Sequence, residues 1–158
     1  MTSGTRLALS GDRVRVGCDV AAVSEVAYSV HRFGDRYLQR VYTAGELRDC
    51  AGPDRIRRLA ARFAAKEAVI KAFATPEMAF PLTSIEVVKR DGTPQLVLHG
   101  SVAHVAGERG WQEVSLSLSH DECHAMALVV VLCDSWQEPT SGVPDVCRPS
   151  LGAGSGND

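Results

Sequence analysis

The sequence predicts a single α+β domain in which an antiparallel sheet packs on a long, buried helix. Helical periodicity dominates the first half of the chain, and one helix there has apolar or small residues nearly all round. Strand-like alternation with short turns dominates the second half. Helices first and hairpin-connected strands later are typical of an α+β domain, and 158 residues suit one such unit.

The first elements follow from local patterns. Val14, Val16 and Cys18 alternate with polar or small residues, which predicts a short strand that ends near Asp19 and Val20. A helix is expected over residues 23–33, ended by Gly34, with helical character again over 36–42. Thr43 followed three residues later by Glu46 is a capping-box signature and predicts a short helix through Cys50.

The long helix is expected over residues 53–73, with Pro53 in its first turn. Ile56, Leu59, Phe63, Ile70 and Phe73 fall within one arc of roughly 100°, and Lys66 projects inside that arc. Most of the opposite side carries alanine (Ala60, Ala64, Ala65, Ala68 and Ala72), so neighbouring elements can approach closely there.

The second half predicts strands over 85–89 and 95–99, joined by a turn at Asp91-Gly92. A short helix over 101–108 follows, and then strands over 113–118 and 123–132 flank a turn that contains His120 and Asp121. We expect residues 1–12 to be a flexible N-terminus, 13–133 the folded domain and 134–158 a disordered tail rich in Gly, Pro and Ser.

Composition excludes several classes of protein. With 17 basic and 19 acidic residues the chain lacks the basic excess of a general nucleic-acid binder. No apolar run reaches the roughly 18 residues that a membrane span needs, and the N-terminus lacks the apolar run of a secretory signal. The five cysteines form no CxxC pair, so we expect reduced thiols in a cytoplasmic protein. The charge is unevenly distributed, because residues 31–71 hold ten basic and five acidic residues.

The long helix also carries charged residues that its surroundings must accommodate. Arg62, Lys66, Glu67 and Lys71 lie on an otherwise apolar or small-residue helix, and burying an unpartnered charge costs several kcal/mol. These side chains should therefore form ion pairs, bind a metal or contact a charged ligand. The alternative is a solvated edge, or a Glu67–Lys71 pair one turn apart that contributes only ~0.2–0.5 kcal/mol.

Three separated segments together carry a family resemblance. These are Gly17-Cys-Asp19-Val, the stretch Arg62-Phe-Ala-Ala-Lys-Glu-Ala-Val-Ile-Lys71, and Ser117-Leu-Ser-His-Asp121. In this order they resemble the 4′-phosphopantetheinyl transferases, specifically the short holo-acyl-carrier-protein synthase type. The resemblance covers about residues 14–133 and implies that family's fold.

The resemblance implies transfer of 4′-phosphopantetheine from coenzyme A to a serine of an apo acyl carrier protein of fatty-acid or polyketide synthesis. The second product would be adenosine 3′,5′-bisphosphate. Asp19 and Glu67 would hold Mg²⁺, a metal usually bound by one or two carboxylates together with substrate phosphates. Glu67 and Lys71 would be catalytic, and the serine proton would pass to Glu67 or to a water on the metal.

The resemblance also implies coenzyme contacts. Lys71 would contact the phosphates, His120 and Pro94 would hold coenzyme A, and Arg62 and Lys66 would be further phosphate or carboxylate partners. Members of this short type resemble one another in forming homotrimers with active sites between subunits, and an apolar second face on the long helix is compatible with that.

Two departures from the family pattern bear on the coenzyme and the carrier. Ala74-Thr75-Pro76 replaces a glycine-threonine-glycine turn, and because Ala and Pro disfavour φ > 0 we expect a reshaped loop. Glu25 stands where an arginine is common on the helix that docks the acidic carrier. Arg32, Arg36 and Arg40 recur at four-residue spacing and would either dock the carrier or form a solvated basic stripe.

Two other functions remain open at this point. One is a different Mg²⁺-dependent enzyme, such as a phosphohydrolase acting on a nucleotide diphosphate. The other is a non-catalytic module that binds coenzyme A or the carrier. The joint presence of Asp19, Glu67 and Lys71 argues against a binding module, because binding alone does not need all three.

Overall fold

The computed structural model describes residues 13–75 and 78–134. The predicted flexible segment 1–12, and the predicted tail from residue 135 onward, lie outside the described residues. The elements are β1 (Val14–Ala22), α1 (Val23–Phe33), α2 (Asp35–Val41), α3 (Ala44–Asp49), α4 (Arg55–Phe73), the 3₁₀ helix η1 (Leu82–Ser84), β2 (Ile85–Arg90), β3 (Thr93–Leu98), α5 (Gly100–Glu108), β4 (Trp111–His120) and β5 (His124–Cys133).

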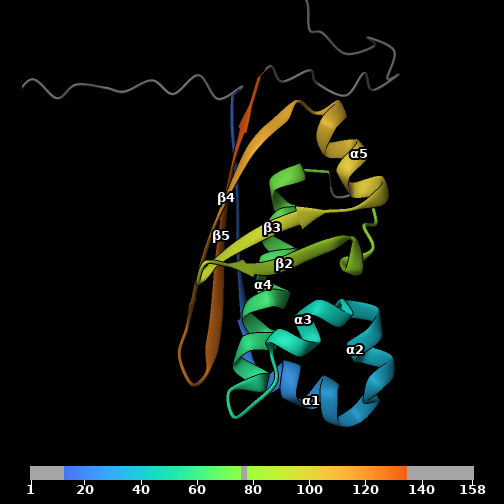
Figure 1. Ribbon diagram of the computed structural model, residues 1–158, viewed down its shortest axis with the longest axis vertical. Helices are drawn as coiled ribbons and strands as arrows, with labels where there is room; N and C mark the ends of the chain where they lie inside the picture. Colours follow the sequence, from blue (N-terminus) through green and yellow to red (C-terminus); the bar gives the residue numbers. More distant parts are fainter. Residues whose placement is uncertain (1–12, 76–77, 135–158) are drawn as a thin grey trace, which may run out of the picture.

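The strands form two separate antiparallel sheets. The larger has the order β1-β5-β4, with Gly17 paired to Val129 and Asp19 to Ala127. The smaller is the β2–β3 hairpin, whose turn places Asp91 at φ 49° and Gly92 at φ 82°. Figure 1 shows the larger sheet along one side of the molecule, with helices α1–α3 at one end and α5 at the other. The expected antiparallel sheet on a long helix is therefore confirmed.

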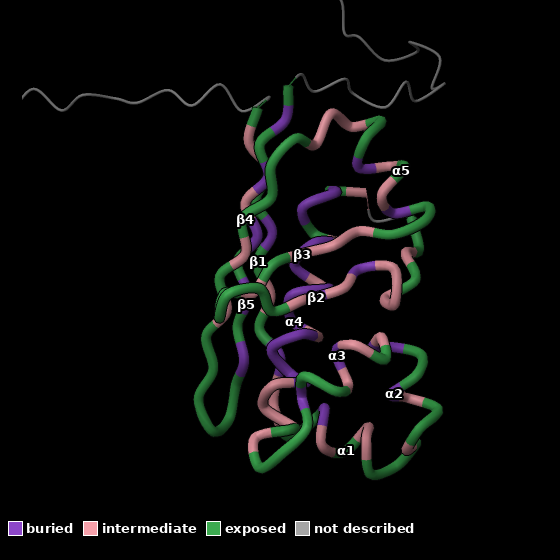
Figure 2. The backbone as a smooth tube through the Cα atoms, viewed as in Figure 1, coloured by how far each residue is buried: buried purple, intermediate pink, exposed green. Residues whose placement is uncertain are grey.

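Helix α4 is the centre of the core. It contacts β1 and β5 on one side and β2 on the other, so it lies between the two sheets. Its residues are buried along most of its length (Figure 2), including Ala64, Ala65, Ala68 and Ala72. Small side chains at these positions let the strands approach the helix, as the sequence pattern predicted.

Gly17 is the point of closest approach between β1 and α4. A Cβ atom built at Gly17 would lie 1.8 Å from the carbonyl oxygen of Ala68 and 2.9 Å from the backbone nitrogen of Ala72. Real Cβ atoms do not come so close to backbone atoms, so only glycine fits here. This contact fixes the position of Asp19, two residues further along the strand, relative to the last turns of α4.

Helices α1–α3 pack on the N-terminal half of α4 around a second group of buried side chains, which includes Val26, Leu38, Tyr42 and Leu59. The hydroxyl of Tyr42 donates to the Leu59 carbonyl oxygen at 3.1 Å. The capping box predicted for α3 is confirmed: Thr43 Oγ1 accepts from the Glu46 amide, and a Glu46 side-chain oxygen accepts from the Thr43 amide.

The element predictions need corrections at β1 and at both ends of α4. Strand β1 continues to Ala22 instead of ending near Asp19 and Val20. Helix α4 begins at Arg55 with Asp54 as its N-cap, so Pro53 precedes the helix instead of entering its first turn. Ala74 ends α4 in the left-handed conformation, with φ 52°, although we expected alanine to avoid it. The chain therefore keeps a glycine-like helix end at Ala74 despite its Cβ. In the described part of the chain, none of the helices has both the length and the apolar character to cross a membrane.

Replacing Gly17 by alanine tests the close packing of β1 on α4. The added methyl would collide with two backbone atoms that cannot move independently of the helix, so Gly17→Ala should destabilise the fold by about 3 kcal/mol or more. Chemical denaturation followed by circular dichroism measures this loss.

Gly107→Ala is the matched control, because nothing lies within 4 Å of a Cβ at this position of α5. This variant should be neutral or stabilised by up to about 1 kcal/mol. Equal stabilities of the two variants would contradict the proposed contact.

Candidate active site

Asp19, Glu67 and Lys71 meet where the second half of β1 crosses the last turns of α4. Lys71 Nζ donates to Asp19 Oδ1 at 2.7 Å, and this bond raises the pKa of Lys71. The Asp19 side chain is 15% exposed and that of Lys71 is 54% exposed, so the pair lies at the surface. Lys71 therefore does not form the local pair with Glu67 that was the alternative expectation. It pairs with the Asp19 carboxylate instead.

The Glu67 carboxyl group has a raised pKa. Partial burial is the larger cause and the nearby negative charge of Asp19 is the next, while Lys71 opposes both. The two carboxylates are thus close enough to repel each other. A pair of partly exposed carboxylates suits a hard divalent cation that also needs oxygen ligands from phosphate and water. Among the described residues no group of three or more His, Cys, Asp or Glu side chains could hold a metal.

A second feature is a cavity of about 390 Å³ that we call the arginine groove. Arg58, Arg62, Lys89, Pro94, Leu118 and His120 line it. It brings together three residues predicted to contact the coenzyme, Arg62, Pro94 and His120, from α4, β3 and the end of β4. The Arg62 side chain is 10% exposed and lies 3.7 Å from an Asp49 carboxylate oxygen. Arg62 Nε is buried and has no hydrogen-bond partner among the described residues.

A third feature, the Glu67 groove, is a hollow of about 820 Å³ on another face of α4. Tyr37, Arg40, Phe63, Glu67, Phe80 and Leu82 are among its lining residues. Arg62 and Glu67 are five residues apart, which places them roughly 140° apart around the helix axis. One chain therefore presents the arginine groove and the Glu67 groove in different directions.

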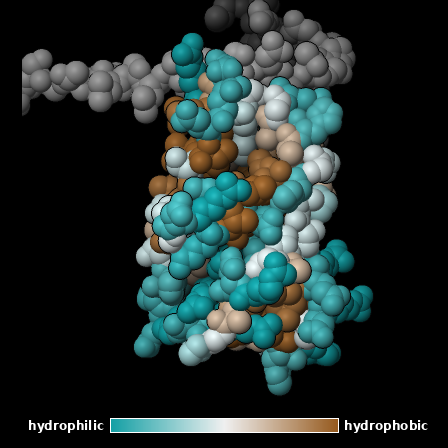
Figure 3. All heavy atoms as spheres, in the orientation of Figure 1, coloured by the Kyte–Doolittle hydropathy of each residue, from teal (hydrophilic) through white to brown (hydrophobic). Residues whose placement is uncertain are grey.

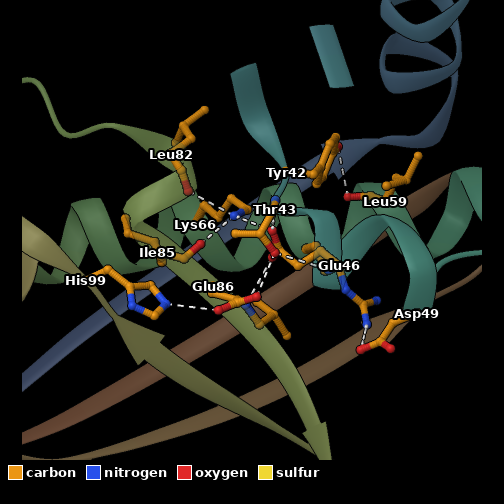
Figure 4. Close-up of polar contacts among 12 residues, drawn as sticks. Tyr42, Thr43, Glu46, Asp49, Leu59, Lys66, Leu82, Ile85, Glu86 and His99 are labelled. Carbon is orange, nitrogen blue, oxygen red and sulfur yellow. Dashed lines mark hydrogen bonds and ion pairs between the residues drawn. The ribbon is translucent and has the colours of Figure 1, made fainter. Parts of the chain in front are cut away.

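Lys66 lies in neither groove, which corrects its predicted coenzyme contact. Its side chain is 0% exposed, and Nζ donates to Glu46 Oε2 at 2.8 Å, to the Leu82 carbonyl oxygen at 2.9 Å and to the Ile85 carbonyl oxygen. An ammonium group has three donors, and all are used, so none is left for a phosphate. Figure 4 shows Lys66 pointing between Glu46 and these carbonyl groups. Its carboxylate partner is Glu46.

The family model of the 4′-phosphopantetheinyl transferase superfamily matches residues 15–129. The chain belongs to this superfamily. The match spans the domain from β1 to β5 and includes Asp19, α4 and the arginine groove. It decides between the alternatives that the sequence left open in favour of the transferases.

Curated relatives within this superfamily share much of the sequence. A holo-[acyl-carrier-protein] synthase of Koribacter versatilis is 42% identical over 118 residues, which are 73% of this chain and 94% of the relative. A second, from Carboxydothermus hydrogenoformans, is 38% identical over 123 residues, or 77% of this chain and 97% of the relative.

Solved structures of superfamily members have the same fold. The crystal structure of a holo-[acyl-carrier-protein] synthase from Neisseria meningitidis superposes with a TM-score of 0.68 at 30% identity, over 74% of this chain and 96% of that chain. A complex of such a synthase with coenzyme A, from Chronobacterium ammoniagenes, gives a TM-score of 0.67 at 31% identity, over 79% and 98%. The predicted transferase-like fold is confirmed.

Some site features of this transferase were missed from the sequence. Arg58 and Lys89 add positive charge to the arginine groove beside Arg62. Arg58 precedes Arg62 by one helical turn, and that spacing was the available signal. Lys89 comes from the β2–β3 hairpin, and no local pattern relates it to α4. The Glu46–Lys66 pair joins residues 20 positions apart and was likewise not predicted.

The three predicted carrier-docking arginines are all exposed, but they do not share one environment. Arg32 is in the last turn of α1 and lies over the Phe33 ring, with 5.6 Å from its guanidinium carbon to the ring centroid. Arg36 lies on α2, and Arg40 lines the Glu67 groove. In the view of Figure 3, hydrophilic side chains surround a smaller hydrophobic area over these helices.

The spacing of the two carboxylates can be tested through the pKa of Glu67. Asp19→Asn removes a negative charge and frees Lys71 to approach Glu67, so both changes should lower this pKa. Carbon-13 NMR titration of the Glu67 carboxyl group measures the shift. Glu122→Gln, an exposed change in the β4–β5 turn, is the control and should leave the pKa unchanged. A Glu67 pKa unaffected by Asp19→Asn would mean that the carboxylates are too far apart to share a cation.

Proposed function

We propose that this protein transfers the 4′-phosphopantetheine group of coenzyme A to a serine hydroxyl of an apo acyl carrier protein and releases adenosine 3′,5′-bisphosphate. The observation that carries the proposal is the juxtaposition of Asp19, Glu67 and Lys71 at one edge of α4 in a chain of this superfamily. The curated relatives, up to 42% identical, are holo-[acyl-carrier-protein] synthases by name.

The arginine groove suits the nucleotide end of coenzyme A. Arg62 and His120 would contact phosphate, and Arg58 and Lys89 add positive charge around it. Pro94 would pack against the nucleoside and shape the backbone there. Asp49, which now lies near Arg62, would be displaced from it by a bound phosphate.

Asp19 and Glu67 would hold Mg²⁺ against the pyrophosphate of coenzyme A. When bound, the metal would neutralise negative charge as the phosphate bond breaks. The Lys71 ammonium now donates a hydrogen bond to Asp19 Oδ1, so the Asp19 carboxylate already binds a positive charge. Once Asp19 is engaged elsewhere, Lys71 would be free to contact the phosphates and stabilise the leaving bisphosphate.

A homotrimer with active sites between subunits would bring the arginine groove of one subunit together with the Glu67 groove of another. The proposal is supported by the separation of the arginine groove from the Glu67 groove within one chain. It is also supported by the outer face of the larger sheet, where exposed apolar residues gather on β1 and β5. These residues are Val16, Val20, Met126, Leu128 and Leu132, each 38–57% exposed.

The carrier would approach over α1 and α2, towards the Glu67 groove. Arg32, Arg36 and Arg40 are exposed and offer positive charge to an acidic carrier. Glu25, also exposed on α1, carries the opposite charge. We therefore expect a preference for a particular carrier, such as one of secondary metabolism, over the fatty-acid carrier.

Removing Glu67 tests the catalytic assignment. Glu67→Ala deletes half of the carboxylate pair and should slow transfer by at least about 100-fold, because charge on the pyrophosphate is no longer stabilised. Intact-mass analysis of apo carrier proteins, incubated with coenzyme A and Mg²⁺, follows the reaction. The exposed Glu108→Ala on α5 is the control and should react like the wild type. Near wild-type turnover by Glu67→Ala would refute the metal site.

Reversing the charge at residue 25 tests carrier selection. Glu25→Arg should raise the rate on an acidic fatty-acid carrier relative to the preferred carrier, because a local repulsion becomes an attraction. Rates on both carriers, measured at two salt concentrations, show the effect, which should shrink at high salt. Equal wild-type rates on both carriers, unchanged by Glu25→Arg, would rule out this selection.

A further inference from the structure

The buried ammonium of Lys66 joins four elements around the Glu67 groove. From α4 it bonds Glu46 of α3, the Leu82 carbonyl of η1 and the Ile85 carbonyl at the start of β2. Glu46 extends the network, because its other oxygen accepts from the Val87 amide of β2 at 3.0 Å. These contacts are drawn in Figure 4.

Stability alone does not explain a lysine at this position. A buried ion pair is often no more stabilising than apolar residues of similar volume, whereas removing one partner is strongly destabilising. An apolar side chain would also pack on α4 at residue 66. It could not, however, donate to the carbonyl groups of Leu82 and Ile85, which the ammonium holds against the helix.

Both walls that face α4 across the Glu67 groove depend on this network. Leu82, which lines the groove, is bonded to Lys66 directly. The opposite wall includes Val41, at the end of α2. Only one residue separates Val41 from Thr43, whose amide donates to the same Glu46 oxygen that binds Lys66. Lys66 in turn directly precedes Glu67 on the helix.

We propose that Lys66 is a positioning residue, which fixes the walls of the Glu67 groove relative to the Glu67 carboxylate. The reacting phosphate and the carrier serine would then be held in the geometry that transfer needs. This inference rests on the proposed function. It assigns Lys66 an effect on turnover without any contact to coenzyme A. Binding of the nucleotide product in the arginine groove, on another face of α4, is independent of it.

The test compares two variants of the full chain. Lys66→Met should destabilise the fold, lower kcat by about 100-fold, as small displacements in an active site do, and leave the affinity for adenosine 3′,5′-bisphosphate unchanged. The double variant Lys66→Met with Glu46→Gln removes both charges but keeps a side-chain oxygen for the Val87 amide, and should recover part of the lost stability. It should not recover kcat, because Leu82 and Ile85 still lack their donor.

A readout that does not depend on activity accompanies the kinetics. Backbone amides of residues 79–85 should exchange hydrogen faster in both variants than in the wild type. Val131→Ala, a buried change in β5 that lines neither groove, is the matched control: it should lose stability while kcat and exchange in 79–85 stay the same.

Two results would overturn the inference. One is a double variant that recovers kcat together with stability, since Lys66 would then only hold the fold. The other is a loss of bisphosphate affinity in Lys66→Met, since Lys66 would then act on the nucleotide site. If the wild type transfers no phosphopantetheine, the proposed function fails. If the Lys66 variants show unchanged amide hydrogen exchange in residues 79–85, the positioning role is refuted independently of the proposed function.

Discussion

The contact of the β1 backbone with the α4 backbone at Gly17 is the constraint on which the placement of Asp19 beside Glu67 and Lys71 depends. The absence of a side chain there lets the strand lie directly on Ala68 and Ala72. Asp19 follows two residues later on the same face of the strand, and Glu67 and Lys71 flank the contact on the helix. The pairing of Gly17 with Val129 fixes β5, and through it β4, relative to this contact. A carboxylate pair between a strand and a helix therefore needs no dedicated loop.

A second constraint acts on the other side of α4. Close backbone packing cannot fix the hairpin and the 3₁₀ helix, because they contact the helix through side chains. There the buried Lys66–Glu46 pair uses charge-assisted hydrogen bonds to carbonyl and amide groups to hold α3, η1 and β2. Lys66 and Glu67 are neighbours in sequence but have separate tasks, since one faces the interior and the other the groove. Helical geometry, with about 100° between successive residues, makes that division possible.

The sequence predicted what depends on local spacing. The capping box of Thr43 and Glu46, the helix end at Gly34 and the hairpin at Asp91-Gly92 each follow from a few adjacent residues, and the structure agrees. Partners distant in sequence were harder to predict. Periodicity placed Lys66 in an apolar arc and required a partner for it, but many acids could have served. Ala74 shows the converse, because tertiary packing keeps a left-handed helix end that local preference opposes.

The charged residues of α4 are divided between the two grooves. Helix α4 carries Arg58 and Arg62 of the arginine groove on the face nearest His120. It carries Glu67 of the other groove on a different face. A ligand that contacts both faces therefore cannot be held by a single chain unless it wraps around the helix. The proposed assembly would need to bring the arginine groove of one copy to the Asp19 and Glu67 carboxylates of the next. Assembly and catalysis would then be linked, because dissociation would separate the residues proposed to bind the coenzyme from those proposed to act on its pyrophosphate.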